Sequence, residues 1–116
     1  NTIKSADILI HGMGEAFVMA KKRGVSETLI QKLKEAGAEG EALGQYFDLD
    51  GKVVYSTDSL ALWPMTLRQS LRSWGLAGGA SKGRAILSVL RSGHDQILVT
   101  DEAAAREILT LLAKSK

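Results

Sequence analysis

Residues 74–86 read WGLAGGASKGRAI, a pattern typical of a short strand, a glycine turn and the start of a helix. Gly78 and Gly79 allow backbone conformations that other residues avoid, and they let a ligand approach the main chain closely. We expect Ser81 to cap the helix, whose first N–H groups carry partial positive charge, and Lys82 adds a full charge beside them. The stretch therefore predicts an anion site, most plausibly for a phosphate, although a turn that merely required glycine is the alternative.

Two further segments have the same strand-to-helix character. Residues 6–12 form a short apolar run that predicts a buried parallel strand, and a helix over residues 15–23 follows it. Residues 96–99 predict another buried strand, after which Thr100 is expected to cap a helix over residues 101–113. Strands that alternate with helices indicate an α/β fold with a largely parallel sheet.

The segments between these units contain a helix and a hairpin. Ser26 is a suitable cap for an amphipathic helix that ends near residue 36. Residues 41–48 and 52–56 predict two strands around Asp50-Gly51, a dipeptide typical of tight turns. A helix is expected over residues 66–73, before the strand of the first stretch.

Composition bounds the class of protein. The 116 residues fit one small domain, the net charge of +2 is too weak to predict nucleic-acid binding by these residues, and no apolar run has the length of a membrane span. The chain contains no cysteine, which suits a cytoplasmic protein and excludes disulfides and cysteine-based sites. Neither His11 nor His94 belongs to a spacing typical of a metal site, so no metal is expected.

The ends of the parallel strands predict where a ligand binds. In open α/β sheets ligands bind beyond the carboxyl ends of the strands, which places residues 12–15, 78–82 and 100–102 along one edge. Cations and backbone amides there would hold a phosphate while a carboxylate accepts from hydroxyl groups, as a phosphosugar requires. Asp101 and Glu102 have a simpler interpretation as acids at a helix start.

Four blocks of the sequence carry a family resemblance. They read ADILIHGMGEA (residues 6–16), GEALGQYF followed by DG (40–51), AGGASK with AI (77–86) and LVTDEAAA (98–105). In order and spacing they resemble the C-terminal part of the effector-binding domain of SorC-family bacterial transcription regulators. The resemblance implies a three-layer α/β domain with a parallel sheet, of the glucosamine-6-phosphate deaminase and ribose-5-phosphate isomerase type. It implies that residues 1–116 are the C-terminal part of this domain, with the N-terminal DNA-binding domain and the first part of the effector domain absent.

The resemblance also implies a function and its partners. The protein is expected to be a cytoplasmic repressor of sugar metabolism that binds operator DNA through its N-terminal domain and assembles as a dimer or tetramer. Its effector would be a phosphosugar such as fructose-1,6-bisphosphate, with no cofactor and no catalysis.

The expected site combines this resemblance with the glycine stretches. The effector-binding residues are expected to be Lys22, Glu41, Gly79, Ser81 and Lys82, with Gly12, Gly14, Arg23 and Asp101 as secondary candidates. By resemblance, Lys82 and Lys22 contact phosphate and Glu41 contacts a sugar hydroxyl. The family has two adjacent arginines where this chain has Lys22-Arg23, and a lysine binds phosphate as a point charge without the two-pronged geometry of arginine.

Two alternatives remain open at this point. An active phosphosugar isomerase or deaminase on the same fold would use His11, Glu15, Glu41 or Asp101 as a base. A dimerisation module that has lost its ligand would bind no phosphosugar.

Overall fold

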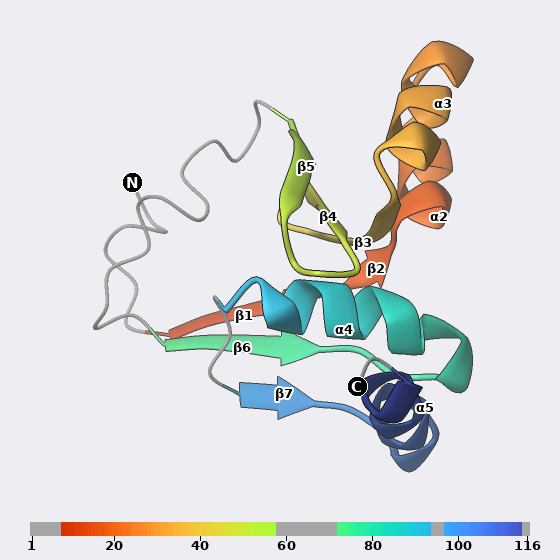
Figure 1. The fold of residues 1–116 in the computed structure, drawn as a ribbon. Helices are drawn as coiled ribbons and strands as arrows, with labels where there is room; N and C mark the ends of the chain where they lie inside the picture. Colours follow the sequence, from red (N-terminus) through yellow and green to blue (C-terminus); the bar gives the residue numbers. More distant parts are fainter. Residues whose placement is uncertain (1–7, 58–71, 94–96, 115–116) are drawn as a thin grey trace.

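A three-stranded parallel sheet forms one half of the fold (Figure 1). The computed structural model describes residues 8–57, 72–93 and 97–114. The strands lie in the order β1 (Ile8–Gly12), β6 (Arg72–Leu76) and β7 (Ile97–Val99), and both neighbouring pairs are parallel. The α/β class and the parallel sheet predicted from the sequence are therefore confirmed.

A second, antiparallel sheet was only partly predicted. It contains β2 (Gly14–Glu15), β3 (Ala38–Ala42), β4 (Gln45–Asp48) and β5 (Val53–Ser56) in that order. The hairpin of β4 and β5 is confirmed, but the single strand expected over residues 41–48 is wrong. The chain reverses at Leu43-Gly44, where φ is +51° and +84°. Two consecutive positive φ angles build a tight hairpin turn, and glycine adopts them more readily than leucine.

The helices match the sequence pattern closely. They are α2 (Ala16–Lys22), α3 (Glu27–Glu35), α4 (Gly83–Arg91) and α5 (Glu102–Lys114), with a short 3₁₀ turn, η2 (Ala80–Lys82), before α4. The Ser26 hydroxyl accepts from the Leu29 N–H, as expected of a helix cap. The helix expected over residues 66–73 lies mostly outside the described residues, and its last two positions belong to β6.

Two predicted helix caps are wrong. Ser81 lies inside η2, so the residue before α4 is Lys82, whose side chain makes no capping bond. Asp101, and not Thr100, caps α5, because its Oδ1 accepts from the Ala104 N–H at 2.8 Å. A carboxylate at this position also interacts favourably with the positive end of the helix.

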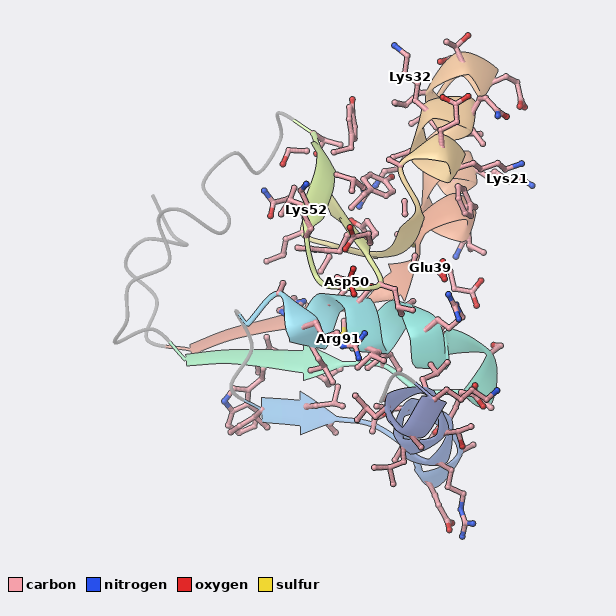
Figure 2. All side chains as sticks on the ribbon, in the orientation of Figure 1. Lys21, Lys32, Glu39, Asp50, Lys52 and Arg91 are labelled. Atoms are coloured by element: carbon pink, nitrogen blue, oxygen red, sulfur yellow. The ribbon has the colours of Figure 1, made fainter. Side chains whose placement is uncertain are left out.

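Helix α4 lies between the two sheets (Figure 1). Its buried side chains share one hydrophobic cluster with Ala42 and Phe47 of the antiparallel sheet, and Leu98 of the parallel sheet packs against this cluster. At the other end of α4, Arg91 donates to the Leu49 carbonyl at 3.0 Å, and Figure 2 shows Arg91 close to the Asp50 turn. The helix thus joins the β4–β5 hairpin to the rest of the molecule.

One face of the parallel sheet differs from the prediction of buried strands. Ile10 is 61% exposed and Val99 is 48% exposed, with Leu76 and Ile97 also on the surface. The strand register explains this, because Ile10, Trp74 and Ile97 lie in one row across the sheet. Leu76 and Val99 lie two residues further along, in the next row on the same face. The apolar runs therefore face the core with alternate residues only.

Candidate functional site

A cavity of about 560 Å³ lies where the two sheets meet. Its size is within the range of sites for small molecules. Its walls come from the end of β1, from β2 and α2, from β3 with its following turn, and from η2. The lining residues are His11, Gly12, Met13, Gly14, Glu15, Val18, Met19, Lys22, Arg23, Glu41, Leu43, Gly44, Thr57 and Lys82.

The cavity brings together three of the five residues expected to bind an effector. Lys22, Glu41 and Lys82 line it, although they belong to α2, β3 and η2. The secondary candidates Gly12, Gly14 and Arg23 line it as well. Gly79, Ser81 and Asp101 do not, so the glycine stretch contributes Lys82 alone.

Positive charge dominates this cavity. Among the described residues, no ion pair joins Lys22 or Lys82 to a carboxylate. Lys22 is exposed at the end of α2, whereas Lys82 is half-buried. The remaining charged side chains are Glu15 and the Arg23–Glu41 pair, which neutralises itself. Two unpaired ammonium groups beside one carboxylate favour an anionic ligand.

Glu41 is a buried carboxylate in the wall of the cavity. It is 3% exposed, and its Oε2 accepts from the Gly44 N–H at 2.9 Å and from the Arg23 guanidinium at 2.9 Å. Burial lowers the pKa of Arg23, but the interactions with Glu41, and to a lesser extent with Tyr46, together outweigh burial and leave the pKa above its ordinary value. Burial also raises the pKa of the neighbouring Tyr46 phenol, which therefore stays neutral.

Asp101 and Gly79 contact each other and do not line the cavity. The Gly79 N–H donates to Asp101 Oδ2 at 2.8 Å, while Oδ1 caps α5. Gly79 has φ of +98°, so glycine suits the turn for conformational reasons. Ser81 lines a separate hollow of about 250 Å³, next to the Arg84–Glu39 ion pair.

We predict that Asp101→Ala destabilises the fold by about 1–2 kcal/mol, because the helix cap and the bond to the Gly79 N–H are both lost. Urea unfolding measures this change. Asp101→Asn is the matched control, since its side-chain oxygen can still cap α5 and should cost about half as much or less. A loss of ligand affinity in Asp101→Ala, at concentrations where the protein is folded, would instead place Asp101 in the site.

The two other candidate bases line the cavity. His11 is buried, and its Nδ1 lies 3.0 Å from the Gly12 carbonyl oxygen, which requires the proton on Nδ1. Glu15 is half-buried at the start of α2. The described residues contain no cluster of side chains that could hold a metal ion, and His94 lies outside them.

Sequence reasoning missed part of the wall and one contact inside it. Leu43, Gly44 and Thr57 line the cavity, and the Thr57 N–H donates to the Gly44 carbonyl at 2.8 Å. A glycine within a run of strand-forming residues is a signal for a break, which could have placed the Leu43-Gly44 turn. The Arg23–Glu41 ion pair has no such local signal.

Comparisons with known proteins identify relatives over nearly the whole chain. Residues 1–110 match the family described as "Putative sugar-binding domain". The chain is 38% identical over 107 residues to the central glycolytic genes regulator of Priestia megaterium, covering 92% of this chain and 31% of that protein. It is equally identical, over 109 residues, to the protein of the same name from Bacillus subtilis, covering 94% and 32%. The chain thus spans about a third of the length of these relatives.

The fold is also similar to that of a solved structure. The crystal structure of "the putative SorC family transcriptional regulator from Enterococcus faecalis" superposes with a TM-score of 0.84 and 36% identity, covering 92% of this chain and 44% of that one. These matches confirm the family resemblance. Among the described residues, no helix has the length and apolar character needed to cross a membrane.

Proposed function

This chain belongs to the sugar-binding domain family, and we propose that it is the effector-binding part of a transcription regulator that senses a phosphorylated sugar. The observation that carries the proposal is the shared cavity of Lys22, Lys82 and Glu41. Two cations that have no ion-pair partner in the described part of the chain suit a phosphate, and a fixed carboxylate suits hydroxyl groups that donate hydrogen bonds. The chain is also similar to two proteins named central glycolytic genes regulator, which supports a role in the regulation of sugar metabolism.

In this proposal the ligand acts by shifting a conformational equilibrium. A phosphosugar such as fructose-1,6-bisphosphate binds the cavity with different affinities in two states of the protein, and this difference changes operator binding by a separate DNA-binding domain. Assembly into dimers or tetramers would respond to the same equilibrium. No chemical step is required of His11, Glu15 or Glu41.

Calorimetry on the whole protein tests this proposal with four probes: fructose-1,6-bisphosphate, fructose 6-phosphate, fructose and inorganic phosphate. We expect at least one sugar phosphate to bind about tenfold or more tightly than fructose, because each charge-assisted phosphate contact contributes about 1.5–3 kcal/mol. The sugar phosphate should be recovered unchanged after prolonged incubation. Equal binding of fructose and its phosphates would contradict the phosphate subsite, and turnover that disappears in Glu41→Ala would establish an enzyme instead.

A further inference from the structure

The Arg23 side chain lies at the cavity but is already engaged. Its guanidinium contacts Glu41 Oε2 at 2.9 Å, and the two side chains differ in burial, with 38% of Arg23 exposed and 4% of Glu41. The contact joins the residue that ends α2 to strand β3. Arg23 is therefore the solvent-facing partner of a nearly buried carboxylate.

The two oxygens of Glu41 have different surroundings. Oε2 accepts from both Arg23 and the Gly44 N–H. Oε1 accepts from none of the described residues, and it lies beside Gly14, where a Cβ atom would be 3.9 Å away. Because Glu41 and Gly14 both line the cavity, Oε1 is the oxygen left to accept a hydrogen bond from a ligand.

The carboxylate depends on Arg23 for this orientation. A nearly buried carboxylate that loses its cationic partner is strongly disfavoured, and it either turns toward water or takes up a proton. In both cases Oε1 ceases to be a fixed, charged acceptor. The Gly44 N–H alone cannot neutralise the charge.

From this geometry we infer that Arg23 is a positioning residue, which fixes Glu41 so that Oε1 accepts from a sugar hydroxyl, and that Arg23 is not a phosphate ligand. The inference rests on the proposed function, since it requires a hydroxyl-bearing ligand in this cavity. The two neighbouring basic residues then have separate roles. Lys22, which pairs with no carboxylate of the described residues, contacts the anion, whereas Arg23 fixes the carboxylate that recognises the sugar.

The test compares fructose 6-phosphate with inorganic phosphate in the whole protein, the second measured by displacement of the first. Arg23→Met should weaken fructose 6-phosphate binding about tenfold and leave the phosphate affinity within about twofold. Arg23→Lys should restore part of the loss, because it returns a cation that can pair with Glu41. The double variant Arg23→Met with Glu41→Gln should bind no more than about twofold more weakly than Glu41→Gln alone.

Different outcomes separate this inference from the proposed function. An equal loss for both probes in Arg23→Met makes Arg23 a phosphate ligand and overturns the inference, as does an additive loss in the double variant. If Arg23→Met does not fold, Arg23→Lys decides: a fall in phosphate affinity as large as the fall for the sugar phosphate overturns the inference. If the unaltered protein binds neither of these probes nor fructose-1,6-bisphosphate, the proposed function itself fails.

Discussion

Replacing Lys82 with methionine is expected to weaken the binding of fructose 6-phosphate by about 10- to 150-fold, which corresponds to about 1.5–3 kcal/mol. Lys82 is half-buried, lines the cavity and has no carboxylate partner among the described residues. A cation that is partly removed from water and left unpaired gains most from a ligand anion. Methionine keeps the apolar length of the side chain and removes only its charge.

Stability should change little in this variant, because the Lys82 side chain makes no capping bond to α4. Calorimetry with the whole protein measures the affinity, and urea unfolding checks the fold. Lys32→Met is the matched control, since Lys32 lies on α3 outside the cavity, and Figure 2 shows it on the part of that helix away from α4. Affinity that is unchanged in Lys82→Met, or reduced equally in both variants, would remove Lys82 from the site.

Elements with a strong local signal were predictable from the sequence. The apolar runs that became β1 and β7, the Ser26 cap and the Asp50-Gly51 hairpin each follow from a short pattern of residues. The change from a strand to a helix around Lys82 was also predicted correctly. Of the residues that predicted an anion site there, Lys82 lines the cavity, whereas Gly78, Gly79 and Ser81 do not.

The errors arise where a distant residue decides the outcome. The Gly79 N–H donates to Asp101, which lies 22 positions later in the chain, and this bond joins two residues that were expected in the site but do not line the cavity. Leu43 adopts a positive φ that its side chain disfavours, and it packs against the main hydrophobic core. Gly44 signals the turn itself, but no short stretch of the sequence predicts the contact of Gly79 with Asp101 or the packing of Leu43.

Part of the cavity lining matches residues that were expected to bind the effector. Lys22, Glu41 and Lys82 were assigned by family resemblance, and the structure places them around one cavity. The ion pair of Arg23 with Glu41 was not foreseen, because it depends on how the end of α2 lies against β3. A family resemblance assigns roles to positions along the chain, whereas the contacts of each side chain depend on how the helices and strands pack.

The close approach of α4 to β3 holds this arrangement together, and Gly40 makes it possible. A Cβ atom at Gly40 would lie 2.5 Å from the Ala85 carbonyl oxygen and would also overlap the Ser88 hydroxyl. Gly40 immediately precedes Glu41, and Ala85 follows Lys82 by three positions. The absence of a side chain at Gly40 therefore lets Glu41 and Lys82 reach the same cavity.

We predict that Gly40→Ala destabilises the fold by about 3 kcal/mol, since the added methyl group meets helix backbone that moves only if α4 moves. Gly37→Ala is the matched control: Gly37 has φ of +78° with no atom near the added methyl group, so it should lose only about 1 kcal/mol from backbone strain. Urea unfolding of both variants provides the comparison, and equal losses would mean that contact with α4 contributes nothing. Under conditions in which Gly40→Ala is folded, the variant should also bind the sugar phosphate more weakly. The added methyl group moves α4 away from β3, so that Lys82 and Glu41 no longer contact one ligand together.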